Sequence, residues 1–276
     1  MSTIINGRNI IGSVYVDEYV QMLKAFDPAK KTVLEGDFFK ATPDMISKAL
    51  EAATNDFENY RNVGKDQRAL FLTTIAEEIT AFKEAIIRRG SSETGLPAAR
   101  LQGELERTAN QLLLFADLVK EGSWVRAVID HADATRQPVP KPDIRNMLVP
   151  LGPVVIFGAG NFPLAFSVAG GDTASALAAG CPVIIKAHPA HYGTGALVAA
   201  AVIRAVEKTN MPKGVFSLLY DDGHEIGQQL AKHPLTKAVV FTGSEKGGMA
   251  LVNIVQKRRQ PVPVFVEMGS INPVLF

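Results

Sequence analysis

The chain has 276 residues, of which 47% are hydrophobic and 21% charged, so its composition excludes a disordered protein. Its 29 basic and 28 acidic residues nearly cancel, so charge gives no reason to expect nucleic acid or a membrane surface as partner. The single cysteine, Cys181, excludes an internal disulfide and a zinc site with several thiolates, and it favours a reducing, cytoplasmic location.

Residues 1–122 have the pattern of charged, amphipathic helices. Thr42 precedes a proline in the manner of an N-cap before the first helical residue, which predicts that a helix begins there. Apolar residues then recur at three- to four-residue intervals within 70–86 and again within 101–118. The second and third helices are expected to end at glycines, Gly90 and Gly122. The start of the chain lacks the pattern of a signal peptide, and no apolar stretch is long enough to span a bilayer.

Residues 123–150 differ from what precedes them. The segment WVRAVID predicts a short strand, and DIRNMLVPLG predicts a second strand that returns alongside it. The stretch between them, ADATRQPVPKPD, is rich in proline and polar residues and is typical of an exposed turn. We therefore expect a small β arm or linker that projects from the main body.

Residues 151–276 alternate between short apolar strands and helix-compatible stretches. The strands are expected at 153–157, 182–186, 215–219, 238–241 and 263–267, and the helices at 163–180, 193–209, 223–232 and 244–257. This alternation predicts an α/β fold with a Rossmann-like parallel sheet and flanking helices. Ligands of such sheets bind beyond the carboxyl ends of the strands, so the residues that follow each strand are the candidate site.

The loop after the first of these strands contains Gly158 and Asn161. Glycine lets the backbone approach a ligand closely, although Pro163 stands where a dinucleotide fingerprint has its third glycine. Asn161 is compatible with two roles, an amide donor to an oxyanion or a cap of the next helix.

Lys186 leaves the second strand and is followed by His188 and Pro189. Its side chain is compatible with reaching the surface or with donating to ribose hydroxyls or a phosphate. His188 and His191 are three residues apart, but no acidic or thiol residue lies nearby in the sequence, so no metal site is predicted.

The last three strands are followed by further candidates. Asp221, Asp222 and Gly223 have the composition of a polar turn. Gly243, Ser244 and Gly248 stand at a predicted helix start, where backbone amides can bind an anion, but the GK(S/T) ending of a Walker loop is missing. Glu267 ends the fifth strand and is compatible with a partly buried base of raised pKa or with a paired structural acid.

Read in order, FGAGNFPLAF, VIIKAHPAHYGTG, VVFTGSEKGG and VEMGSINPVLF resemble the aldehyde dehydrogenase superfamily. The first two are most similar to its α-ketoglutarate semialdehyde (2,5-dioxovalerate) dehydrogenase branch. The resemblance covers nearly the whole chain, and it implies a coenzyme domain whose helical first part is 1–122, whose arm is 123–150 and whose Rossmann-like core is 151–276.

The resemblance also implies roles for single residues. Asn161 matches the oxyanion asparagine, and Glu267 matches the general base that activates water for deacylation. Lys186 matches the lysine at the adenosine ribose, and Gly243 and Ser244 match the turn at the pyrophosphate. The remaining implied cofactor-binding residues are Gly158, His188, Pro189, Gly223 and Gly248.

Several departures from the family pattern matter. Pro189 stands where NAD-preferring members carry a glutamate that would repel a 2′-phosphate, so NADP is expected to be accepted or preferred over NAD. Gly160 replaces a tryptophan, and Asp221 or Asp222 replaces a glycine.

The family's nucleophilic cysteine lies downstream of the glutamate motif, and Cys181 does not match it. The chain is therefore expected to be an N-terminal portion without the catalytic domain and to be inactive alone. With that domain, the function implied is NAD(P)-dependent oxidation of an aldehyde to a carboxylate by a homo-oligomer. The alternative is a non-catalytic fragment that binds a dinucleotide.

Overall fold

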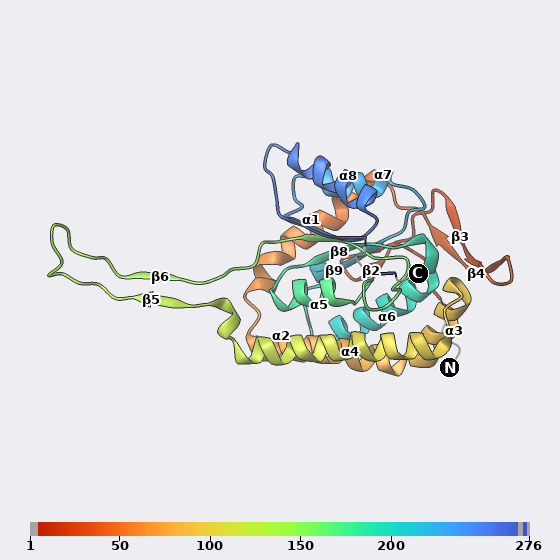
Figure 1. Ribbon diagram of the computed structural model, residues 1–276, viewed down its shortest axis with the longest axis horizontal. Coiled ribbons are helices and arrows are strands. Elements are labelled where there is room, and N and C mark those ends of the chain that lie inside the picture. Colours follow the sequence, from red (N-terminus) through yellow and green to blue (C-terminus); the bar gives the residue numbers. More distant parts are fainter. Residues whose placement is uncertain (1–4, 270–272, 275–276) are drawn as a thin grey trace.

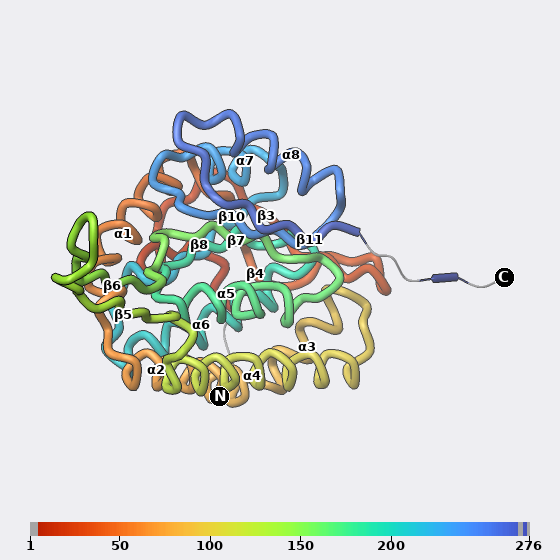
Figure 2. The backbone as a smooth tube through the Cα atoms, turned by 60° about the vertical axis from the view of Figure 1, so that its left-hand side comes forward, coloured from red at the N-terminus to blue at the C-terminus, as the bar shows by residue number. Residues whose placement is uncertain are grey.

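A computed structural model describes residues 5–269 and 273–274 of the chain. Its centre is a seven-stranded sheet with helices on both faces (Figures 1 and 2). Five strands are parallel, in the order β11 (Val264–Met268), β10 (Ala238–Gly243), β7 (Val154–Phe157), β8 (Val183–Lys186) and β9 (Phe216–Leu219). The predicted α/β fold and the five predicted strands are thus confirmed.

Alternate residues of the buried strands face opposite layers of helices. Val154 and Ile156 of β7 belong to one core, and Val155 and Phe157 belong to the other. The first core packs against α5 (Gly171–Ala178), α6 (Tyr192–Lys208), α2 (Lys65–Ala81) and α4 (Ala98–Glu121). The second core packs against α1 (Pro43–Arg61), α7 (Glu225–Lys232) and α8 (Glu245–Gln256).

The helices of the first part of the chain form largely where predicted. Thr42 caps α1, because its side chain accepts a hydrogen bond from the Met45 amide, and Gly122 ends α4 with a φ of 88°. Gly90, however, does not end a helix. It lies inside α3 (Lys83–Thr94), where an added Cβ would come within 3.2 Å of Leu101 in α4, and the helix ends instead at Gly95.

The expectation that 1–122 is helical is wrong for residues 10–39, which contain four strands. β1 (Ile10–Ile11) and β2 (Val14–Tyr15) extend the central sheet beyond β9 in antiparallel orientation. β3 (Met22–Asp27) and β4 (Thr32–Phe39) form a separate hairpin. Exposed and buried residues alternate along β3, which is the period of a strand with one buried face.

The helix predicted over 163–180 is shorter than expected. Only α5, Gly171–Ala178, is helical, and the residues before it form a loop. Two backbone amides of that loop, those of Leu164 and Ala165, donate instead to the buried carboxylate of Glu104.

The arm expected at 123–150 extends away from the body (Figure 1). A short 3-10 helix (Ser123–Val125) leads into β5 (Val128–Asp130), which pairs antiparallel with β6 (Ile144–Asn146). All six residues of these two strands are exposed.

Two further 3-10 segments, Pro189–His191 and Lys213–Val215, precede α6 and β9. In the described part of the chain, no helix is both long and apolar enough to cross a membrane.

Candidate functional site

A large cleft lies at the carboxyl ends of the parallel strands, as expected for this class of sheet. Its volume of about 1450 Å³ exceeds that of an ordinary small-molecule pocket, which suits an extended ligand. Its lining includes nine residues singled out from the sequence: Gly158, Asn161, Lys186, His188, Pro189, Gly223, Gly243, Ser244 and Glu267. The fold therefore brings together residues that are more than 100 positions apart.

Gly248 does not line this cleft. A Cβ on Gly248 would lie 2.4 Å from the sulfur of Met268 and 3.4 Å from the Phe241 ring. The absence of a side chain at this position therefore lets α8 pack closely on β11. Gly243 packs in a related way, since its Cβ would lie 2.6 Å from the Phe241 ring.

Asn161 lies in the loop that follows β7. Its backbone carbonyl accepts a hydrogen bond of 3.0 Å from the Arg100 guanidinium, which also stacks over the Phe162 ring at 5.2 Å. None of the hydrogen bonds among the described residues engages the side-chain amide of Asn161, so that amide is available as a donor in the cleft.

Glu104 of α4 binds the same loop through hydrogen bonds to its backbone. It is buried, and its Oε1 accepts hydrogen bonds from the amides of Leu164 and Ala165 at 2.8 and 2.9 Å. Two backbone donors of the loop are thus satisfied by one carboxylate, which fixes the backbone just after Asn161.

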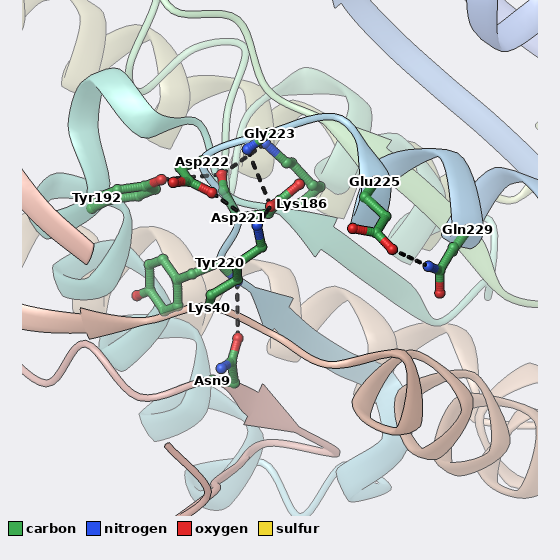
Figure 3. A network of polar contacts seen from close by, with 10 residues as sticks. All are labelled: Asn9, Lys40, Lys186, Tyr192, Tyr220, Asp221, Asp222, Gly223, Glu225 and Gln229. Carbon is green, nitrogen blue, oxygen red and sulfur yellow. Dashed lines mark hydrogen bonds and ion pairs between the residues drawn. The ribbon is translucent and has the colours of Figure 1, made fainter. Parts of the chain in front are cut away.

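Lys186 ends β8 and points into a polar network (Figure 3). Its Nζ donates a 3.0 Å hydrogen bond to the carbonyl oxygen of Asp221, which also accepts one from the Tyr192 hydroxyl at 3.0 Å. Burial lowers the pKa of Lys186, and the nearby carboxylates of Asp221 and Asp222 oppose that shift.

His188 has a neutral imidazole. Burial, followed by His191 and Lys186, lowers the pKa of His188 to about 3. Its Nδ1 accepts a 3.2 Å hydrogen bond from the Ala190 amide, so the proton of the neutral ring belongs on Nε2. A Cβ on Gly160 would lie 2.6 Å from this ring, so the side chain of His188 occupies the space beside the glycine.

Ser244 is the N-cap of α8. Its hydroxyl accepts a 3.2 Å hydrogen bond from the Gly247 amide, and Ser244, Lys246 and Gly247 at the start of the helix line the cleft. A helix N-terminus with an adjacent lysine favours a negatively charged group.

Glu267 is the penultimate residue of β11 and its side chain is exposed, so the first of its two interpretations, a partly buried base, does not match the structure. Asp172, in the first turn of α5, lies close enough to sense this carboxylate. The pKa of Asp172 is raised by burial and, to a lesser extent, by the charge of Glu267.

Cys181 is buried and is not among the residues that line the cleft. Burial raises the pKa of its thiol, which disfavours the thiolate that a nucleophile requires. Within the described residues, no group of three His, Cys, Asp or Glu side chains is arranged to hold a metal ion.

Sequence reasoning missed four residues that act at or behind the cleft: Lys40, Arg100, Glu104 and Asp172. Arg100 and Glu104 lie within α4. The spacing of apolar residues in this helix predicted only which of its faces is buried. A charged residue on that face, Glu104, was the one local signal, because a carboxylate is rarely buried without partners.

The donor set of the cleft fits a dinucleotide. Lys186, Lys246 and the start of α8 suit phosphate and ribose oxygens, while Phe241, Leu251 and Ile254 provide an apolar wall for a flat ring.

Comparison with known proteins gives a consistent result. A family model described as "Aldehyde dehydrogenase family" matches residues 15–276. An "Alpha-ketoglutaric semialdehyde dehydrogenase 2" of Azospirillum brasilense is 53% identical over 272 residues, which are 98% of this chain and 52% of that protein. An "Alpha-ketoglutaric semialdehyde dehydrogenase" of Acinetobacter baylyi is 47% identical over 86% of this chain and 45% of that protein. The chain thus spans about half the length of these curated relatives.

Among solved structures, an E. coli NADP-dependent enzyme matches with a TM-score of 0.84 and 23% identity. The match covers 98% of this chain and 53% of that one, and at this identity it bears on the fold alone.

Proposed function

This chain belongs to the aldehyde dehydrogenase family, and we propose that it is the coenzyme-binding part of an enzyme that oxidises a semialdehyde to a carboxylate. The observation that carries the proposal is the convergence of Asn161, Lys186, Ser244 and Glu267 on one cleft at the carboxyl edge of the sheet. α-Ketoglutarate semialdehyde is the proposed substrate, because two relatives at about 50% identity carry that activity in their names.

NADP, or NAD, is the proposed cofactor. Lys186 with His188 and Pro189 would hold the adenosine ribose, and Gly223 leaves room beside them. Gly243, Ser244 and the first amides of α8 would hold the pyrophosphate, while Gly158 and Gly248 allow close packing around the site. Pro189 brings no carboxylate that would repel a 2′-phosphate, which supports NADP.

When a cofactor is bound, its nicotinamide accepts a hydride. The chain itself would supply two side chains to the chemistry. The side-chain amide of Asn161 would donate a hydrogen bond to the oxyanion that forms on the aldehyde carbon. Glu267 would take a proton from the water that hydrolyses the acyl intermediate.

The nucleophile is not supplied by these residues, because Cys181 is buried away from the cleft. This observation favours a second candidate function, a chain that binds the dinucleotide without turning over an aldehyde. The two candidates make the same prediction for binding and opposite predictions for activity of the native gene product.

The arm supports a further proposal, that the whole protein is a homo-oligomer. Its strands β5 and β6 expose Val128, Ile129 and Ile144, each at least half accessible, on an element that touches little of the body. Apolar strands that extend from a domain are typical of surfaces covered by a partner.

The test has two steps. Isothermal titration calorimetry of the 276-residue chain with NADP and with NAD measures binding, and Lys246→Met, at the start of α8, should weaken both. Absence of binding to either dinucleotide would reject the proposal. The intact mass of the native gene product, followed by an assay of NADPH formation with α-ketoglutarate semialdehyde, then separates the enzyme from the binding chain.

A further inference from the structure

Lys40 is held behind Asp222, a residue of the cleft lining, by an interaction between distant parts of the chain. It follows β4 directly and forms a parallel bridge with Tyr220, the residue after β9. The Ala41 amide donates a 2.8 Å hydrogen bond to the Tyr220 carbonyl, and the Lys40 amide donates one of 2.9 Å to Gln21. The backbone at Lys40 is therefore fixed beside the loop of Asp221 and Asp222.

The side chain of Lys40 forms ion pairs with both carboxylates of that loop (Figure 3). Its Nζ lies 3.1 Å from Asp222 Oδ1 and 3.5 Å from Asp221 Oδ1. Asp222 is 46% exposed and lines the cleft, whereas Asp221 is fully buried. The hydrogen bond to Asp222 is the main reason that the pKa of Lys40 is raised, so Lys40 stays charged.

The other lysine of the network is already engaged elsewhere. Lys186 donates to the Asp221 carbonyl oxygen, and no ion pair of its Nζ with either carboxylate is found among the described residues. Among the described residues, Lys40 is therefore the lysine that forms ion pairs with this loop, and its shorter contact is with Asp222. Without Lys40, Asp222 would present an uncompensated carboxylate to the cleft.

We propose that Lys40 is a specificity-determining residue, which permits a 2′-phosphorylated dinucleotide by neutralising Asp222 beside Lys186 and His188. This inference rests on the proposed binding of NADP, and it adds a residue from the first 40 positions to that site. A phosphomonoester carries nearly two negative charges at neutral pH, so it is more sensitive to an uncompensated carboxylate than is a ribose hydroxyl.

The experiment is calorimetric titration of NADP and NAD into the 276-residue chain and four variants: Lys40→Met, Lys40→Arg, Asp222→Asn and Lys40→Met combined with Asp222→Asn. Lys40→Met should weaken NADP about three- to tenfold and NAD by less than twofold, as expected for one partly solvated charge. Lys40→Arg should retain the preference, because it keeps the charge. The double variant should restore the ratio of the two affinities toward that of the unmodified chain.

Lys24→Met is the matched control, since Lys24 also pairs with an aspartate, Asp37, within the N-terminal strands but lies outside the cleft. It should leave both affinities unchanged. The effect of Lys40→Met should shrink at high salt, where exposed charges are screened.

Equal losses of NADP and NAD affinity in Lys40→Met, with no recovery in the double variant, would mean that Lys40 only holds the loop, and would overturn the inference. Thermal melting of each variant identifies a loss caused by unfolding. If Lys40→Met is unfolded, Asp222→Asn alone is the test. An unchanged ratio of NADP affinity to NAD affinity in Asp222→Asn then overturns the inference as well. Failure of the unmodified chain to bind either dinucleotide would instead reject the proposed function.

Discussion

The carboxylate of Glu104 accepts a 2.8 Å hydrogen bond from the backbone amide of Leu164, which lies 60 residues later in the chain. The same oxygen accepts a second bond from the next amide. A buried acid in α4 thus determines the conformation of the loop that carries Asn161, although it lines no part of the cleft itself.

Replacement of Glu104 by alanine should lower the free energy of unfolding by about 2–4 kcal/mol, since two buried amides would lose their acceptor. Urea denaturation measures this change. The exposed Glu106, two residues away on the same helix, is the matched control, and Glu106→Ala should cost less than about 0.5 kcal/mol. Equal stability of Glu104→Ala and the unmodified chain would contradict the assigned role.

A side chain at Gly160 should conflict with His188. Gly160→Ala should destabilise the chain by about 1–3 kcal/mol, because the added Cβ would lie 2.6 Å from the imidazole. The combination with His188→Ala should cost less than the sum of the two single changes, as is usual for residues in contact. Gly171→Ala, where a Cβ meets nothing within 4 Å, should be nearly neutral. If the free-energy changes of Gly160→Ala and His188→Ala, measured by urea denaturation, were strictly additive, the His188 ring would move freely and the prediction would be contradicted.

The neutral imidazole of His188 should make stability depend on pH. Because its pKa falls from 6.5 to about 3 on folding, the unfolded chain binds more protons between these values. The stabilising contribution is therefore complete above pH 6.5 and is lost as the pH falls below it, at about 1 kcal/mol per pH unit. The buried His191, whose pKa is also lowered by burial, adds to the same slope.

Unfolding free energies measured between pH 5 and 7 test this dependence. His188→Asn should reduce the slope, whereas His131→Asn, at a side chain that is 83% exposed, should leave it unchanged. An unaltered slope in His188→Asn would mean that other groups account for the pH dependence.

The apolar strands of the arm should promote self-association. Replacement of Ile129 and Ile144 by lysine places two charges on side chains that are 55% and 51% exposed, so folding should be little affected while contacts between chains are lost. Sedimentation velocity should show a smaller particle for this double variant than for the unmodified chain. Leu114→Lys, at a leucine of α4 that is 61% exposed, is the control. If the unmodified chain and both variants are all monomers, the arm does not mediate self-association.

The predictable part of this protein is local. The apolar runs from Val154 to Phe157 and from Val183 to Lys186 are too short for helices and rich in β-branched residues, so they identified strands, and the alternation with helices identified the parallel sheet. The carboxyl ends of parallel strands must meet at one edge, so the sequence also predicted that Asn161 and Glu267 belong to the same region.

The tertiary structure alone decided which charges support that edge. Lys40 meets Asp222 across 182 residues, and Glu104 meets Leu164 across 60, so no local pattern pairs them. The short strands β1 and β2 likewise exist because they extend the edge of β9, and two residues have too little periodicity to predict a strand. Secondary structure follows from local periodicity, whereas the partners of a buried or cleft-facing charge depend on how distant segments pack.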